Sequence, residues 1–194
     1  MDKKIILIGG FHEIIELCEE NGYTIVGIID NNFQNSYLDY PIIGTDEDAE
    51  VLFNTYGSIP IVITPDLPNL RKKLFEKYSN IGFDFETIIS GSAKVSRSSM
   101  IGKGSIIQHG VNISANVKIG KLVKANTGSN IMHDCNIQDF VTIAPNAVIF
   151  GRVKVENNVY VGANSTILPD LIINANSIIG AGSVVTKNIL EGLV

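Results

Sequence analysis

Aliphatic residues recur at every sixth position across the second half of the chain. Counting in sixes from Val95 to Val185 gives Ile or Val at every position except Ala125. A second series, two residues before each of these, runs from Ala93 to Ser183 and consists almost entirely of small or β-branched residues. Because residues two apart on a strand point to the same side, both series are expected to line one interior. A sustained six-residue period predicts a parallel β-helix.

Three such hexads would make one triangular coil, so that each residue stacks on the residue eighteen positions further on. Adjacent coils would lie about 4.8 Å apart. Glycine or asparagine often follows the aliphatic residue directly. Since both tolerate positive φ, these positions are predicted to form the corners between strands. They include Gly102, Gly120, Asn126, Gly162, Asn174 and Gly180.

The first part of the chain alternates between short apolar runs and amphipathic stretches. Strands are predicted at 3–8, 24–29, 41–44 and 59–64, and helices at 13–21, 46–56 and 68–78. Strands that alternate with helices indicate a small, Rossmann-like parallel sheet. The sequence therefore predicts an α/β domain over residues 1–86 and a β-helix domain over 87–194. The first domain would cap the first coil, whose open strand edge would otherwise favour aggregation.

Two features of the α/β domain suggest a ligand site. In parallel sheets, ligands bind beyond the carboxyl ends of the strands. Here these ends carry the Gly9, Gly10 and His12 loop and, after the second strand, Asp30. The two glycines could also form only a tight turn, and His12 could simply begin a helix. A complete G-x-G-x-x-G is missing, so no nicotinamide cofactor is predicted.

Composition excludes several classes of function. The net charge is −5 and no lysine- or arginine-rich run occurs, which argues against nucleic-acid binding. The apolar run Ile5 to Ile8 is too short for a signal peptide, and no segment reaches the length of a membrane span. Cys18 and Cys135 are far apart in unlike contexts, which favours a reducing, cytoplasmic location over a disulfide framework.

One histidine has the neighbours that acyl transfer requires. His109 and His133 both follow an aliphatic residue by two positions, so both are expected at corners, on different edges of the β-helix. No pair of histidines has metal-ligand spacing, and no metal is predicted. Asp134 follows His133, and Gly151 would lie one coil above it. These residues would supply a base, a group that orients it and a backbone N–H for an oxyanion. A corner histidine can also be merely solvated.

The sequence around these residues resembles that of a known protein family. The run NTGSNIMHDCNIQDF (126–140), followed by APNAVIFGRVKV, VYVGANSTILPDL and IIGAGSVVTKNI, resembles the PglD/NeuD family of bacterial sugar acyltransferases. The α/β part fits through IIDNN, YPIIG, a helix carrying Arg71, and GFDFETIISGSAKVS. The resemblance covers essentially the whole chain. It implies a left-handed β-helix, a homotrimer with active sites between neighbouring subunits, acetyl-CoA as co-substrate and a nucleotide-linked amino sugar as acceptor.

The resemblance also implies roles for individual residues. His133 would be the general base of a direct transfer, Asp134 its acidic neighbour and Gly151 the amide facing the thioester carbonyl. The resemblance implies that Asn126 contacts the substrate, and together with the sheet-edge residues Gly9, Gly10, His12 and Asp30 this residue is expected to bind the sugar nucleotide. Residues implied to contact CoA are Thr142, Gly162, Ala163, Ala181 and Gly182. Two alternatives remain, namely O-acetylation of a sialic-acid-type sugar and a non-catalytic trimeric scaffold or sugar-binding protein. Cys135 falls in the inward series and is interpreted as a core residue.

Overall fold

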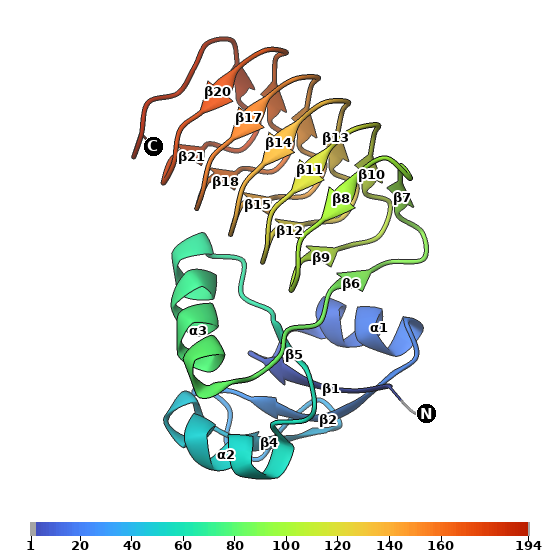
Figure 1. Ribbon diagram of the computed structural model, residues 1–194, viewed down its shortest axis with the longest axis vertical. Coiled ribbons are helices and arrows are strands. Elements are labelled where there is room, and N and C mark those ends of the chain that lie inside the picture. Colours follow the sequence, from blue (N-terminus) through green and yellow to red (C-terminus); the bar gives the residue numbers. More distant parts are fainter. Residues whose placement is uncertain (1–2, 194) are drawn as a thin grey trace.

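The computed structural model describes residues 3–193 and consists of an α/β part beside a stack of β-coils (Figure 1). The α/β sheet has the strand order β3-β4-β2-β1-β5, and all of its pairs are parallel except β3 with β4. Its strands are β1 (Lys3–Ile8), β2 (Tyr23–Ile29), β3 (Ser36–Tyr37), β4 (Tyr40–Gly44) and β5 (Ile61–Ile63). Its helices are α1 (His12–Glu20), α2 (Ala49–Tyr56) and α3 (Pro68–Ile81).

The helix signals in the sequence have local physical causes. In α3, Pro68 occupies the first turn, and the helix ends at Gly82, whose φ of 113° lies in the left-handed region. The helix predicted over 46–56 is divided, because a 3₁₀ turn over Asp46–Asp48 precedes α2. A capping box begins the 3₁₀ turn, where the Asp48 carboxylate accepts hydrogen bonds from both the amide and the hydroxyl of Thr45 at 2.8 Å.

The remaining strands are two residues each and stack into three parallel sheets. The first runs through β7 (Lys94–Val95), β10 (Asn112–Ile113), β13 (Asn130–Ile131), β16 (Val148–Ile149), β19 (Thr166–Ile167) and β22 (Val184–Val185). The second runs through β8 (Met100–Ile101), β11 (Lys118–Ile119), β14 (Asn136–Ile137), β17 (Lys154–Val155) and β20 (Ile172–Ile173). The third runs through β6 (Ile88–Ile89), β9 (Ile106–Ile107), β12 (Lys124–Ala125), β15 (Thr142–Ile143), β18 (Tyr160–Val161) and β21 (Ile178–Ile179).

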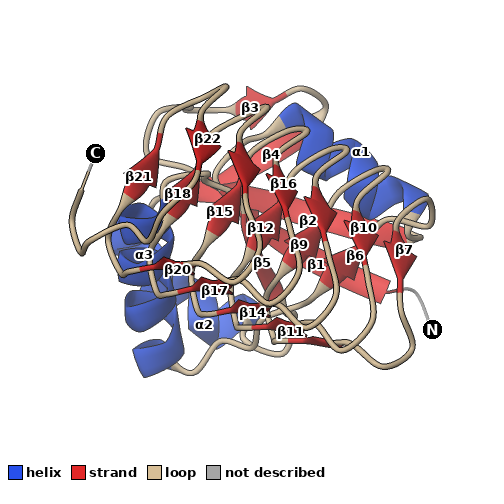
Figure 2. Ribbon diagram, turned by 90° about the horizontal axis from the view of Figure 1, so that it is seen from above, coloured by secondary structure: helices blue, strands red, loops and turns tan. Residues whose placement is uncertain are grey.

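The pairing confirms the predicted stacking. Asn112 pairs with Asn130, and Ile113 with Ile131, which is the eighteen-residue register. Both periodic series are internal: the core contains Ile131 and Ile149 of the aliphatic series together with Cys135 and Val153 of the small series. Figure 2 shows the strands of successive coils following one another along the stack.

The predicted corner conformation is wrong by two positions. Left-handed φ values occur at every sixth residue from Gly104 to Gly182, and not directly after the aliphatic residue. Gly102 and Gly162 are needed for another reason. A Cβ on Gly102 would lie 2.4 Å from the Gly120 carbonyl, and one on Gly162 would lie 2.5 Å from the Ile179 carbonyl. These glycines therefore allow close approach of adjacent coils.

Two left-handed corner positions carry large apolar residues, and they mark where the α/β part packs. Leu122 (φ 52°) and Phe140 (φ 61°) are buried with Phe75 of α3 and with Phe85. Left-handed backbone costs a non-glycine residue about 1–2 kcal/mol, and burial of these side chains offsets that cost. At the first coils, Ile88 and Ile106 join the core beneath α1. The α/β part thus covers the face built from β6, β9, β12 and β15 as well as the first coil (Figure 1).

Arg71 of α3 connects the α/β part to the β-helix through hydrogen bonds. Its side chain is 1% exposed. It donates to three β-helix carbonyls, those of Leu122 at 3.0 Å, Phe140 at 2.8 Å and Val141 at 3.1 Å. It also donates to the Pro65 and Asp66 carbonyls of the loop before α3. A planar guanidinium can satisfy this many fixed acceptors at once.

Candidate functional site

His133 and Asp134 form an ordered pair at the corner after β13. The Nδ1 atom of His133 lies 2.8 Å from Oδ2 of Asp134. The other carboxylate oxygen accepts a hydrogen bond from Nδ2 of Asn116, one coil away, at 3.2 Å. The His133 hydrogen bond, followed by that of Asn116, lowers the pKa of Asp134 below its usual range. An ionised Asp134 accepts the Nδ1 proton, which leaves Nε2 of His133 as the basic nitrogen.

Gly151 lies against the imidazole, as the eighteen-residue stacking predicts. A Cβ placed on Gly151 would be 2.7 Å from both Cε1 and Nε2 of His133. The next residue, Arg152, donates its amide to the His133 carbonyl at 3.0 Å. Within residues 3–193, no acceptor is found for the Gly151 amide itself. The basic nitrogen and an unsatisfied backbone donor are therefore neighbours.

A ladder of polar side chains continues along this corner. Arg152 is bound by Asp170 through two hydrogen bonds, Nε to Oδ1 at 2.6 Å and Nη2 to Oδ2 at 2.8 Å. Asn116, Asp134, Arg152 and Asp170 are each eighteen residues apart. Asn116, Arg152 and Asp170 were not predicted from the sequence, although the same periodicity that placed Gly151 also relates them to Asp134.

The residues predicted to contact CoA lie at a different corner, after the sheet that contains β18 and β21. Ala163 follows β18, and Gly182 donates to its carbonyl at 2.8 Å. Ala181 and Gly182 are exposed, and Gly162 is buried between coils. Within one chain, a single corner therefore carries the small residues Gly162, Ala163, Ala181 and Gly182. His133 lies at another corner, one side of the triangle away.

Thr142 does not fit the predicted contact with CoA. Its side chain is fully buried, and its hydroxyl donates to the Asp66 carbonyl at 2.5 Å. The α/β part covers this position, which a count of hexads could not reveal. The structure removes Thr142 from the candidate CoA contacts.

The predicted sugar-nucleotide residues are partly brought together. Gly9 and Asp30 line one open pocket with Asn31, Asp46 and Leu74. Both carboxylate oxygens of Asp30 accept backbone amides, one from Gly10 and one from Asn32, each at 2.7 Å.

His12 and Asn126 lie elsewhere. His12 is exposed, pairs with Glu16 along α1 at 3.2 Å, and is not among the residues that line the pocket beside Asp30. Asn126 is buried at the corner after β12, where its Nδ2 donates to Asp66 at 3.2 Å.

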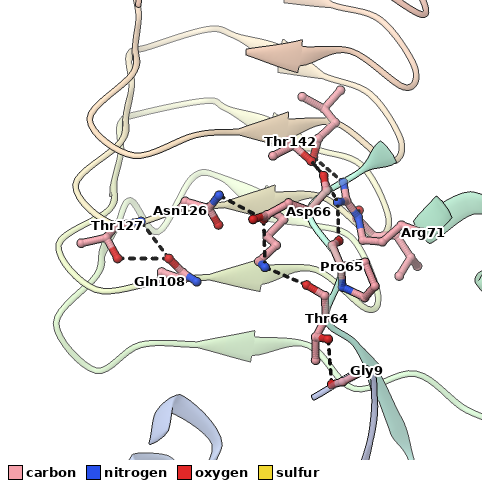
Figure 3. A network of polar contacts seen from close by, with 12 residues as sticks. Gly9, Thr64, Pro65, Asp66, Arg71, Gln108, Asn126, Thr127 and Thr142 are labelled. Atoms are coloured by element: carbon pink, nitrogen blue, oxygen red, sulfur yellow. Dashed lines mark hydrogen bonds and ion pairs between the residues drawn. The ribbon is translucent and has the colours of Figure 1, made fainter. Parts of the chain in front are cut away.

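A polar cluster that the sequence did not indicate joins the loop after β5 to the β-helix (Figure 3). Lys124 of β12 is fully buried, and its Nζ lies 2.9 Å from Oδ1 of Asp66 and 2.7 Å from the Thr64 carbonyl. Burial lowers the pKa of Lys124, and the charge of Asp66 opposes that shift. A lone lysine on a two-residue strand carries no sequence signal for such a contact.

Three further observations bear on the chemistry. Cys135 is buried as predicted, its Sγ donates to the Phe150 carbonyl at 3.0 Å, and burial raises the pKa of its thiol. Within residues 3–193, no three potential metal ligands are grouped together. Over the same residues, no helix is long and apolar enough to cross a membrane.

Known proteins resemble this chain in sequence and in fold. Residues 152–187 match the family model described as bacterial transferase hexapeptide (six repeats). The GDP-perosamine N-acetyltransferase of Caulobacter crescentus has a similar structure, solved as a mutant with CoA and GDP-perosamine. It superposes with a TM-score of 0.92 at 28% identity, and the match covers 97% of this chain and 91% of the Caulobacter chain. The chain is similar in fold and in its repeats to hexapeptide-repeat sugar acyltransferases. The resemblance to the PglD/NeuD family is thereby confirmed, as is the predicted α/β and left-handed β-helix fold.

Two other relatives extend the comparison. The acetyltransferase domain of PglB from Neisseria gonorrhoeae FA1090, solved with acetyl coenzyme A, has a TM-score of 0.89 at 25% identity and covers 99% of this chain and 95% of its own. A GDP-perosamine N-acetyltransferase of Escherichia coli O157:H7 is 40% identical over 84 residues. That match covers 43% of this chain and 38% of the relative.

Proposed function

We propose that this protein transfers the acetyl group of acetyl-CoA to the amine of a nucleotide-linked amino sugar. The arrangement of His133, Asp134 and Gly151 carries this proposal. The amine would attack the thioester carbonyl carbon, forming the C–N bond, while Nε2 of His133 takes the amine proton. Collapse of the tetrahedral intermediate breaks the C–S bond, and the proton passes to the departing thiolate of CoA.

The roles of the other two residues follow from their contacts. Asp134 holds the imidazole by its Nδ1 atom and so keeps Nε2 available as the base. The free amide of Gly151, beside Nε2, would stabilise the oxyanion that develops on the carbonyl oxygen. Direct transfer is favoured over an acyl-enzyme, because the Cys135 thiol is buried and its pKa is raised.

The proposed assembly is a homotrimer with the reaction centre between subunits. The separation of the two sets of residues supports a site shared between subunits, because His133 lies at a different corner of one chain from the small residues at Gly162, Ala163, Ala181 and Gly182. A second copy could bring its own corner to His133 and complete the site. A solution mass of three times the 21.0 kDa chain is the expected result from light scattering.

The identity of the acceptor is proposed from the relatives. The Caulobacter protein is described in complex with GDP-perosamine, which makes a nucleotide-linked amino sugar the first candidate. Thiol release from acetyl-CoA should occur with GDP-perosamine or with UDP-linked 4-amino sugars, and not with free or CMP-linked sialic acids. Turnover restricted to the sialic acids would replace N-acetylation by O-acetylation.

The test of the mechanism is His133→Ala. It should lower kcat by at least about 10²-fold, as loss of a general base does. A near-normal rate in a folded His133→Ala variant would refute the assignment.

A further inference from the structure

Asp66 is fixed between the two parts of the molecule by four contacts (Figure 3). Its Oδ1 atom accepts from Nζ of Lys124 at 2.9 Å and from Nδ2 of Asn126 at 3.2 Å. Its backbone carbonyl accepts from the Thr142 hydroxyl at 2.5 Å and from Arg71 at 2.8 Å. A loop residue held in this way cannot move independently of the β-helix.

Lys124 orients the Asp66 carboxylate through a buried ion pair. The lysine is 1% exposed, and its Nζ also lies 4.4 Å from the centroid of the Phe11 ring, in the loop that leads into α1. A buried ammonium is tolerated only where a carboxylate and further hydrogen bonds compensate for its lost hydration. Asp66 supplies that charge, and the carbonyl of Thr64 supplies the additional acceptor.

The orientation of Asn126 depends on the same charge. Its Nδ2 points to Asp66, whereas its Oδ1 is buried with no partner among the described residues. An unpaired buried carbonyl is unfavourable. In the opposite orientation of the amide, Oδ1 of Asn126 would face Oδ1 of Asp66, and the two oxygens would repel each other. Asp66 therefore fixes the orientation of the Asn126 amide.

The second carboxylate oxygen of Asp66, Oδ2, takes no part in these contacts. Within residues 3–193, Oδ2 has no hydrogen-bond partner, and the side chain is 36% exposed. Two positions earlier, the Thr64 hydroxyl donates to the carbonyl of Gly9 at 2.9 Å, which places Asp66 close to the glycine loop. The following residue, Leu67, lines an apolar groove of about 400 Å³ together with Tyr160.

We propose that Asp66 is a specificity-determining residue of the sugar-nucleotide site, with Oδ2 accepting a hydrogen bond from a hydroxyl or amino donor of the sugar. Lys124 and Asn126 are the positioning residues that hold it. This inference rests on the proposed function. It adds the Asp66 carboxylate as the group that would distinguish a sugar with a hydrogen-bond donor next to Oδ2 from a sugar without one. A fixed, charged acceptor discriminates strongly against a ligand that leaves it unpaired.

The test is Asp66→Asn, with kinetics for both substrates. The KM for the nucleotide-linked amino sugar should rise at least about 10-fold, as for loss of a hydrogen bond to a charged group. The KM for acetyl-CoA should not change. Glu50→Gln on α2, an exposed position, removes the same charge and serves as the matched control.

A second variant separates recognition from folding. Asp66→Asn alone leaves the Lys124 ammonium buried without its partner, which is destabilising. The double variant Asp66→Asn with Lys124→Met removes that charge, so it should regain thermal stability and retain the raised KM for the sugar nucleotide. Wild-type KM values in both folded variants would overturn the proposal and leave the acetyltransferase function standing. An equal rise in both KM values would also overturn it, as a purely structural effect. A wild-type enzyme that turns over no amino sugar would overturn the proposed function and this inference together.

Discussion

The imidazole of His133 packs directly on the Cα atom of Gly151, one coil away in the stack. A methyl group at Gly151 would come within 2.7 Å of two ring atoms, closer than real Cβ contacts allow. The glycine is therefore required by the neighbouring ring. Its own backbone does not demand it, since its φ is not in the left-handed region.

Gly151→Ala should therefore displace the imidazole without unfolding the chain. A shift of about 1 Å in a reacting group can cost on the order of 10²-fold in rate, so kcat should fall by about that factor while the melting temperature stays nearly constant. Gly91→Ala is the matched control. Gly91 holds the same turn position two residues after Ile89, and a Cβ there would meet nothing. Equal activity of the two variants would contradict the assigned role of Gly151.

Asn116 positions Asp134, and its removal should weaken catalysis less than removal of His133. Asn116→Ala deletes the donor to Oδ1 of Asp134. We expect kcat to fall roughly 3- to 10-fold, consistent with the coupling typical of residues in one hydrogen-bond network. Asn146→Ala controls for the backbone, because Asn146 has a similar φ of 58° at another corner. A loss of the same size in both variants would assign the effect to backbone strain.

Asp170 binds the guanidinium of Arg152, the residue that follows Gly151. The two hydrogen bonds from Arg152 to Asp170 occupy the guanidinium on the side of the next coil. In Asp170→Ala, the released guanidinium should turn to Asp134 and compete with His133, lowering kcat about threefold or more. The double variant Arg152→Ala with Asp170→Ala should recover the rate. A double variant no faster than the single one would show that the Arg152 side chain does not interfere.

Arg71 should dominate the stability of the contact between the two parts. Arg71→Met leaves five carbonyl acceptors without their donor, and buried unsatisfied groups cost about 1–3 kcal/mol each. Some of these carbonyls keep other donors or gain water, so we expect a loss of several kcal/mol in urea denaturation. Arg71→Lys should rescue little, because an ammonium cannot replace the planar fork. Full rescue by lysine would mean that charge alone matters.

Cys135 should be dispensable for chemistry. Burial raises the pKa of this thiol, and only the thiolate is nucleophilic. Iodoacetamide at neutral pH should therefore leave Cys135 unmodified in the native protein and alkylate it in urea, as read by intact mass. Cys135→Ala should keep kcat within about threefold, since no catalytic group is lost. A stable acetyl adduct on Cys135 would establish an acyl-enzyme instead.

The six-residue period by itself determined the β-helix. Strand, corner and interior repeat with the same spacing, so the register of eighteen and the neighbours of His133 follow from counting. Asp134 is adjacent in sequence, and Gly151 is one coil away. The α/β part was also accessible, since the apolar runs and the Pro68 and Gly82 signals define its strands and helices locally. The corner conformation was misplaced, because a glycine can be required by close packing as well as by positive φ.

Only the tertiary structure decided what lies between the two parts. Thr142, Lys124 and Asn126 occupy ordinary positions of the repeat, and nothing local distinguishes them from solvent-facing residues. Docking of the loop that carries Asp66 buries them and gives each a partner far away in sequence. The outward face of a β-helix repeat is set by what packs on it, whereas its interior is set by its own sequence. That difference is why the core and the His133 corner could be predicted and the Asp66 cluster could not.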